Sequence, residues 1–157
     1  MVHSIMFTLE PIGYVSSPRD DTSDDGWGNI EAQVELRPEF APEALDGIEE
    51  FSHVEVVFLF DRVPENRIER GARRPRGNSA WPQVGIFAQR GENRPNRLGV
   101  SVARLVSRQG RHLVLRGLDA INGTPVLDIK PVMREFLPDG EIRQPSWSRE
   151  LMSHYWR

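Results

Sequence analysis

The segment from residue 98 to 131 most strongly limits what this chain can fold into. Two runs, LGVSVARLVSR (98–108) and RHLVLRGL (111–118), alternate apolar with polar residues and are joined by Gln-Gly. A third run, TPVLDIKP (124–131), follows the turn-like link DAING. Alternation with a period of two is typical of half-buried strands, and short Gly-containing links are typical of hairpins. The three runs therefore predict an antiparallel meander.

Four more runs have strand character: PIGYVSS (11–17), IEAQVELRP (30–38), VEVVFLF (54–60) and QVGIFAQ (83–89). The run at 54–60 is almost continuously β-branched and aromatic, which predicts a strand buried on both faces. Seven strands with few helical periods predict a mainly β fold, an antiparallel barrel that is closed or nearly closed.

A chain of 157 residues is the usual size of one domain, so we expect residues 1–157 to form a single domain. Short helices are expected near 42–48 and 148–156. The segment from 65 to 82 is rich in Arg, Pro and Gly and has no usable period, which predicts a long functional loop.

Several classes of protein are disfavoured by composition. No apolar run approaches the roughly 20 residues that span a membrane, and the first residues do not resemble a secretory signal, so we expect a cytoplasmic protein. The chain has no cysteine. Its histidines, His3, His53, His112 and His154, lie far apart in the sequence without metal-ligand spacing, so no metal is expected.

Charge is distributed unevenly although the net charge is only -3. Asp20, Asp21, Asp24 and Asp25 crowd the first loop, whereas the middle of the chain is strongly cationic. Its arginines are Arg62, Arg67, Arg70, Arg73, Arg74, Arg76, Arg90, Arg94, Arg97, Arg104, Arg108, Arg111 and Arg116. Clustered guanidinium groups suggest a polyanionic partner. The overall pI near 5.8 argues against nucleic-acid binding along the whole surface.

Five motifs together resemble a known family. They are FSH (51–53), RPRGN (74–78), VGIFAQR (84–90), RPNRLGVS (94–101) and LDAINGTPVLDIKP (118–131). Over roughly residues 8–135 the chain is similar to the TrmO/YaeB-type (TsaA-like) tRNA methyltransferases. This resemblance implies a homodimeric β-barrel enzyme that uses S-adenosylmethionine to methylate N6-threonylcarbamoyladenosine beside the tRNA anticodon. Since the chain stops at Arg157, we expect a short form without the extra C-terminal domain of longer members.

The resemblance also implies a cofactor site. Arg90 is the leading candidate to hold the carboxylate of the cofactor, because a guanidinium can grip it with two hydrogen bonds. Asp119 could accept a ribose hydroxyl or, alternatively, form a turn by capping its own backbone. The other positions that map to this site are Asp25, Gly26, Trp27, Asp61, Arg62, Val100, Arg116, Gly117 and Leu118. At Asp61 and Arg62 the residue types differ from the family pattern, so only backbone roles carry over.

Two residues are candidates for catalysis. The acceptor nitrogen of a carbamoylated adenosine is a good nucleophile only once its proton leaves, so an acid–base group is useful. Asp128 and Lys130 alternate to one face of the same predicted strand, and could relay that proton and offset the charge of the threonyl carboxylate. The alternative is a structural ion pair at the end of the barrel.

The remaining candidates concern the tRNA. Phosphate contacts are expected from Arg73, Arg74, Arg76, Arg94 and Arg97, with Asn96 beside them. In this loop Pro95 would fix the backbone, Asn96 would brace it through side-chain hydrogen bonds, and Gly99 would let it approach the cofactor closely. The family pattern often has Pro in place of Arg97, and an aromatic residue in place of Val132.

Two other functions stay open. One is an S-adenosylmethionine-dependent methyltransferase of a small molecule or another RNA. The other is a non-catalytic barrel that binds nucleic acid or a nucleotide, with the arginine-rich loop as its binding surface.

Overall fold

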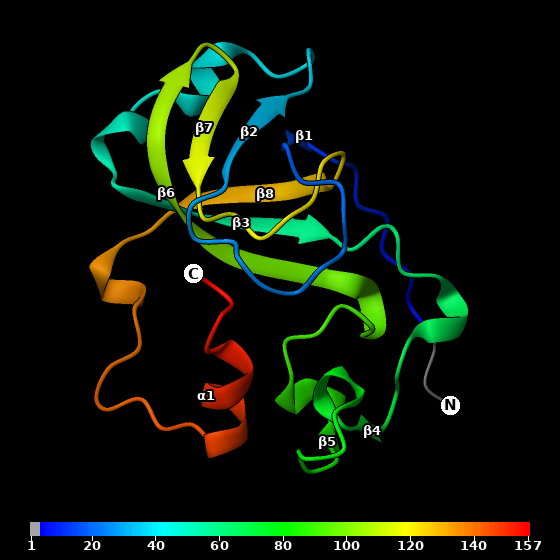
Figure 1. The fold of residues 1–157 in the computed structure, drawn as a ribbon. Coiled ribbons are helices and arrows are strands. Elements are labelled where there is room, and N and C mark those ends of the chain that lie inside the picture. Colours follow the sequence, from blue (N-terminus) through cyan, green and yellow to red (C-terminus); the bar gives the residue numbers. More distant parts are fainter. Residues whose placement is uncertain (1–3) are drawn as a thin grey trace.

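Six antiparallel strands form a closed barrel in the computed structural model, which describes residues 4–157 (Figure 1). The strands are β1 (Gly13–Ser16), β2 (Glu31–Leu36), β3 (His53–Leu59), β6 (Leu98–Gln109), β7 (His112–Arg116) and β8 (Pro125–Pro131). Around the barrel their order is β1-β2-β7-β6-β3-β8, and pairing of β8 with β1 closes it. The prediction of a mainly β barrel is confirmed.

Alternating side chains fill the barrel interior. Along β2 exposed and buried residues alternate, and on β3 it is Val54, Val56 and Phe58 that are buried. The residues between them are only half-buried, so the prediction that β3 is buried on both faces is wrong. A Cβ at Gly99 would lie 2.4 Å from the ring of Phe58. Gly99 is therefore required by core packing, which is a different reason from the close cofactor approach expected from the sequence.

The meander expected from 98 to 131 is only half correct. β6 and β7 form the predicted hairpin, but β7 and β8 are not neighbours, because β7 pairs with β2 and β6 while β8 pairs with β1 and β3. The link between β7 and β8 bonds to other segments. Gly117 N–H donates to Ile30 (3.0 Å) and Gly123 N–H to Val15 (2.8 Å). With the link held in this way, β8 pairs with β1 on the side opposite to β2.

A strand over 83–89 is not observed. Only β5 (Val84–Gly85) forms a strand here, paired with β4 (Ala72–Arg73) in a separate two-stranded sheet, and 3-10 helix η5 (Ile86–Ala88) follows. The buried Gln89 amide donates to the carbonyls of Arg73 and Val84, each at 3.0 Å, which stabilises this small sheet. The segment expected as a structureless loop thus contains β4 and the 3-10 helices η3 (Glu65–Arg67) and η4 (Pro75–Gly77).

Helices are few and short, as expected. The predicted helix near 42–48 is two 3-10 turns, η1 (Pro42–Leu45) and η2 (Ile48–Glu50), and the C-terminal one is α1 (Ser146–Met152). Two further 3-10 turns are η6 (Pro95–Arg97) and η7 (Arg134–Phe136). α1 and the β4–β5 hairpin lie side by side beneath the barrel (Figure 1), where the Trp81 indole donates to Glu150 at 2.8 Å. Within residues 4–157, none of the helices has the length and apolar character needed to cross a membrane.

Candidate active site

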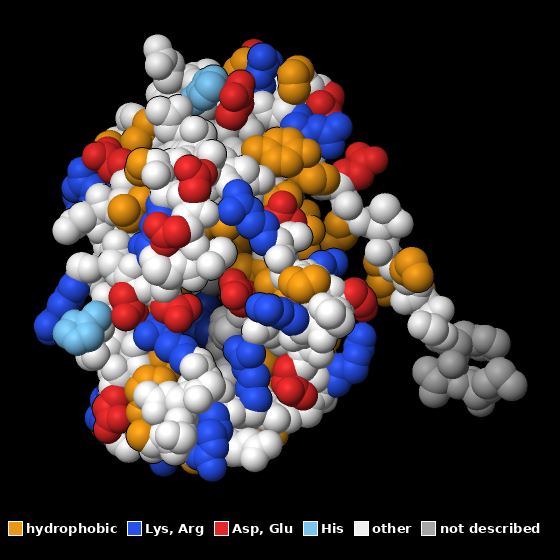
Figure 2. Space-filling view, turned by 45° about the vertical axis from the view of Figure 1, so that its right-hand side comes forward, with side chains coloured by type: hydrophobic (Ala, Val, Ile, Leu, Met, Phe, Trp, Pro, Cys, Tyr) orange, Lys and Arg blue, Asp and Glu red, His pale blue; other side chains and the backbone are white. Residues whose placement is uncertain are grey.

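A cleft of about 1680 Å³ lies outside the barrel, against β6. Six segments wall it: the first loop with Trp27, residues 58–63 at the end of β3, the arginine-rich segment from 73 to 96, the outward-facing β6 residues Leu98, Val100 and Val102, residues 119–124, and the C-terminal residues 144–156. Figure 2 shows one face of the molecule, on which basic and acidic side chains alternate around a hollow. The cleft thus combines an apolar strand face with mixed charge.

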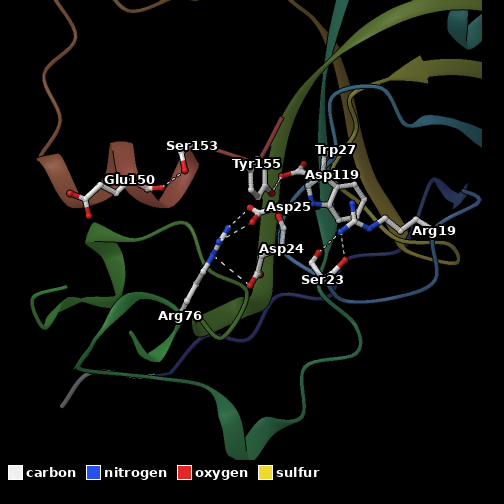
Figure 3. A network of polar contacts seen from close by, with 10 residues as sticks. All are labelled: Arg19, Ser23, Asp24, Asp25, Trp27, Arg76, Asp119, Glu150, Ser153 and Tyr155. Carbon is white, nitrogen blue, oxygen red and sulfur yellow. Dashed lines mark hydrogen bonds and ion pairs between the residues drawn. The ribbon is translucent and has the colours of Figure 1, made fainter. Parts of the chain in front are cut away.

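Two polar atoms in the cleft walls are buried without a hydrogen-bond partner among the described residues. They are the Nε of Arg73, a donor, and the Oδ1 of Asp119, an acceptor. The other carboxylate oxygen of Asp119 accepts a hydrogen bond from the Tyr155 hydroxyl (Figure 3). A buried polar group without a partner costs about 1–3 kcal/mol. The cleft is therefore suited to a ligand that brings both an anionic acceptor and a hydroxyl donor.

The acidic first loop is tied to the arginine-rich segment (Figure 3). The Arg76 guanidinium lies 2.9 Å from a carboxylate oxygen of Asp25 and 3.5 Å from one of Asp24. The Arg19 guanidinium stacks 3.7 Å from the ring centre of Trp27, whose indole N–H donates to the Asp24 carbonyl at 3.0 Å. Arginine stacked on an indole is held by cation–π attraction. These contacts within the chain hold the cleft wall near Trp27 in place.

Two titratable groups in the cleft have shifted pKa values. Burial raises the pKa of Tyr155 well above its ordinary value, and the negative charge of Asp119 adds to the shift, so the phenol stays a hydrogen-bond donor. Burial also raises the pKa of Glu92, as does the charge of Asp24, while Arg73 opposes both. Both side chains line the cleft.

The candidate cofactor residues fall into two groups. Those that line the cleft are Trp27, Asp61, Arg62, Arg90, Val100 and Asp119. Arg90 donates to the Val100 carbonyl at 2.9 Å, and Arg62 donates to the Asp20 carbonyl at 3.0 Å. Arg90 therefore lies along the β6 wall of the cleft.

The other candidates do not line it: Asp25, Gly26, Arg116, Gly117 and Leu118. Asp25 pairs with Arg76, and Gly26 N–H donates to the His154 carbonyl at 3.1 Å. Leu118 is fully buried in the core, and Arg116 lies 3.5 Å from Glu31. Asp25 therefore contacts the cleft residue Arg76, whereas Leu118 and Arg116 have structural contacts away from the cleft.

The candidate tRNA residues are engaged mostly with their own chain. Arg73, Arg76, Arg94 and Asn96 line the cleft, whereas Arg74 and Arg97 do not. Arg94 donates to the Gln89 carbonyl at 2.7 Å and Arg97 to the Val63 carbonyl at 2.7 Å. Much of this cationic segment therefore uses its guanidinium groups to hold backbone that lacks regular structure.

The turn at residues 95–97 has an unusual backbone. Asn96 (φ 62°) and Arg97 (φ 51°) are both left-handed, which asparagine tolerates and proline, fixed near −65°, cannot adopt. Among the described residues the Asn96 side chain forms no hydrogen bond, so the expected bracing by its amide is not observed. Asn96 shapes the turn through its backbone conformation.

Asp128 and Lys130 lie on the outer face of β8, away from the cleft lining. Their side chains form an ion pair at 3.0 Å and are 49% and 65% exposed. Asp128 is paired with Val57, which is paired on its other side with the cleft residue Val100. Two strand spacings separate Asp128 from Val100, about 10 Å.

The C-terminal segment was missed as part of the site. Trp147, Leu151 and Tyr155 line the cleft, together with Met152. Trp147 and Leu151, four residues apart, lie along one side of α1, and Tyr155 follows in the turn after the helix. That periodicity was visible in the sequence, but nothing in it indicated what the apolar side would cover.

Comparisons with known proteins agree with the fold. Residues 16–136 match the family described as the tRNA-methyltransferase O N-terminal domain. The chain belongs to this family. The chain superposes on the crystal structure of TrmO from Pseudomonas aeruginosa with a TM-score of 0.76 and 31% sequence identity. The superposition covers 94% of this chain and 64% of the TrmO chain.

Two curated relatives carry names that describe function. A probable S-adenosyl-L-methionine-binding protein of Pyrococcus abyssi is 38% identical over 146 residues, covering 87% of this chain and 73% of that protein. The human tRNA (adenine(37)-N6)-methyltransferase is 34% identical over 145 residues, covering 87% of this chain but 32% of the human protein. The chain therefore spans about a third of the human relative. Within residues 4–157, no group of three or more His, Asp or Glu side chains is placed to hold a metal ion.

Proposed function

We propose that this chain transfers a methyl group from S-adenosylmethionine to the N6 nitrogen of N6-threonylcarbamoyladenosine beside the tRNA anticodon. The observation that carries the proposal is the cleft with its buried, unpartnered Arg73 Nε and Asp119 Oδ1. The names of the archaeal and human relatives, which refer to S-adenosylmethionine and to tRNA adenine, support it.

The cleft residues suit each part of the cofactor. Arg73 and Arg90 offer guanidinium groups for its carboxylate, and Asp119 offers an acceptor for a ribose hydroxyl. The exposed faces of Leu98 and Val100 offer apolar contact for the adenine. The bound cofactor supplies a sulfonium methyl group that is open to in-line attack. The protein's main task is therefore to position the two reactants.

Glu92 is the cleft carboxylate best suited to accept the proton of the acceptor nitrogen. Four carboxylates line the cleft. Asp24 lies beside Arg76 and Asp119 accepts from Tyr155, so both are already engaged, which leaves Asp61 and Glu92. The raised pKa of Glu92 makes it a stronger base than an ordinary glutamate. We therefore assign it the proton-transfer role in this proposal, in place of the Asp128–Lys130 pair.

We further propose that the active form is a homodimer. β6 exposes Val102 (48%) and Val106 (44%), and Phe87 beside the cleft is 75% exposed. Only part of this apolar surface can be covered by a ligand in the cleft, because Val106 does not line it. A second copy would bury the remainder. Sedimentation of the purified protein tests this proposal; a monomer at working concentrations would contradict it.

The direct test of the proposed function uses tRNA. Purified protein and S-adenosylmethionine are incubated with tRNA from a strain that lacks the gene, and the digested nucleosides are analysed by mass spectrometry. We expect a gain of one methyl group on N6-threonylcarbamoyladenosine. Methylation of a different nucleoside would replace the proposed substrate.

A second candidate, methylation of a small molecule, is favoured by one observation. Arg94 and Arg97 donate to carbonyls of their own chain, which leaves fewer guanidinium groups for phosphates. Binding of S-adenosylmethionine without any methylation of tRNA would support this second function.

A further inference from the structure

The C-terminal residues pack against the first loop through main-chain contacts. Gly26 and Trp27 donate their N–H groups to the carbonyls of His154 (3.1 Å) and Tyr155 (2.8 Å). A Cβ at Gly28 would lie 1.9 Å from the Trp156 carbonyl oxygen, so only glycine permits this approach. Residues 154–156 are therefore fixed by backbone geometry as well as by side chains, although they lie beyond the part of the chain that matches the family, residues 16–136.

Tyr155 is held in place from several sides. Its N–H donates to the Met152 carbonyl at 3.1 Å, and its ring packs edge-on against Trp156 with ring centres 4.8 Å apart. Its hydroxyl donates to Oδ2 of Asp119. The phenol stays protonated because its pKa is raised, so this donor is present at every physiological pH.

The bond from Tyr155 decides how Asp119 faces the cleft. A hydrogen bond to one carboxylate oxygen restricts rotation of the group, and so narrows the directions in which its second oxygen can point. That second oxygen, Oδ1, is the buried acceptor without a partner. We propose that Tyr155 is a positioning residue that orients Asp119 to accept a hydrogen bond from a ribose hydroxyl of the methyl donor. The C-terminal segment is then part of the cofactor site, an inference that rests on the proposed function.

The test measures whether Tyr155 acts through the ribose hydroxyls. The affinities of S-adenosylhomocysteine and of its analogue lacking both ribose hydroxyls are measured by calorimetry for wild type, Tyr155→Phe and Tyr14→Phe. Tyr14, the other tyrosine of the chain, lies exposed on β1 outside the cleft and serves as the matched control. Thermal unfolding checks that each variant folds.

For Tyr155→Phe we expect S-adenosylhomocysteine to bind about tenfold more weakly, in line with one poorly oriented hydrogen bond to a charged group. The analogue should lose less than about twofold, since it has no hydroxyl for Asp119 to accept from. Tyr14→Phe should change neither affinity. Equal losses for both ligands, or no loss for either, overturn the inference while the proposed function stands. If wild type binds neither ligand, the proposed function falls and the inference falls with it.

Discussion

The barrel and the segments that wall the cleft are stabilised in different ways. In the barrel, buried apolar residues alternate along paired strands, and Val34, Leu113 and Leu115 are fully buried. In the cleft walls, guanidinium groups donate to carbonyls of irregular backbone, as Arg94 does to Gln89. The barrel interior depends mainly on apolar side chains of the right period, with Gly99 as a specific requirement, whereas the cleft walls depend on particular polar residues at many positions. Stability should therefore depend mainly on the barrel, and function mainly on the segments that wall the cleft.

The largest expected effect is on stability and comes from the barrel. Leu115→Ala should lower the free energy of unfolding by about 2–5 kcal/mol, because it leaves a cavity in a fully buried site. Denaturant unfolding measures this change. Leu137→Ala, at an exposed position outside the barrel, is the matched control and should cost less than about 0.5 kcal/mol. Similar losses for both would contradict the assignment of the core.

The next prediction compares the roles of two carboxylates in catalysis, Glu92 in the cleft and Asp128 outside it. Glu92→Gln should lower kcat/KM by about 100-fold, the lower range for loss of a general base. Asp128→Asn should leave kcat/KM within about threefold, because its exposed ion pair lies outside the cleft. Steady-state methyl transfer to tRNA measures both. The reverse pattern, with both variants folded, would restore Asp128 to the catalytic role expected from the sequence.

A smaller effect tests the docking of the C-terminal segment. Gly28→Ala should weaken S-adenosylmethionine binding by about tenfold, because the new methyl group displaces Trp156 and, with it, Tyr155. Hydrogen exchange should show faster exchange at Gly26 and Trp27, with the β-strands unchanged. Gly85→Ala is the matched control, since nothing lies near its Cβ position. Unchanged affinity in Gly28→Ala would separate the C-terminal segment from the site.

The smallest effect concerns tRNA. Arg74 uses its Nη1 for the carbonyls of Ser79 and Trp81, and among the described residues its other guanidinium nitrogens form no hydrogen bond. Arg74→Gln should weaken tRNA binding a few-fold and reduce the slope of log affinity against log salt by about one, as loss of one phosphate contact does. Arg116→Gln, whose guanidinium is paired with Glu31, should change neither. Filter binding at several salt concentrations measures the slope. An unchanged slope in Arg74→Gln would remove Arg74 from the tRNA surface.

The same contrast explains what the sequence could predict. Local patterns indicated all six barrel strands: period-two alternation, which burial on one face imposes, and for β3 an almost continuous β-branched and aromatic run. The run QVGIFAQ also suggested a strand at 83–89. There the Gln89 side chain donates to the carbonyls of Arg73 and Val84, which favours the short β4–β5 pairing followed by a 3-10 turn. The pairing of β8 with β1 depends on contacts far apart in the sequence, which no local pattern records.

Prediction of the site was similarly uneven. Resemblance to the family pointed to Arg90, Val100 and Asp119, which do line the cleft. It did not point to Tyr155, which lies 36 residues from its partner Asp119. Clustered arginines suggested a polyanion, but the sequence could not show that Arg97 bonds to the Val63 carbonyl. Charge composition reveals donors, and only the fold reveals which of them are already engaged.

Titration calorimetry with S-adenosylmethionine tests the central claim most directly. The account predicts saturable binding of one cofactor per chain by wild type, weakened at least tenfold in Asp119→Ala because the ribose hydroxyl loses its acceptor. Barrel stability should be unchanged in this variant. Absence of binding by folded wild type, or equal binding by Asp119→Ala, would contradict the assignment of the cleft as the methyl-donor site.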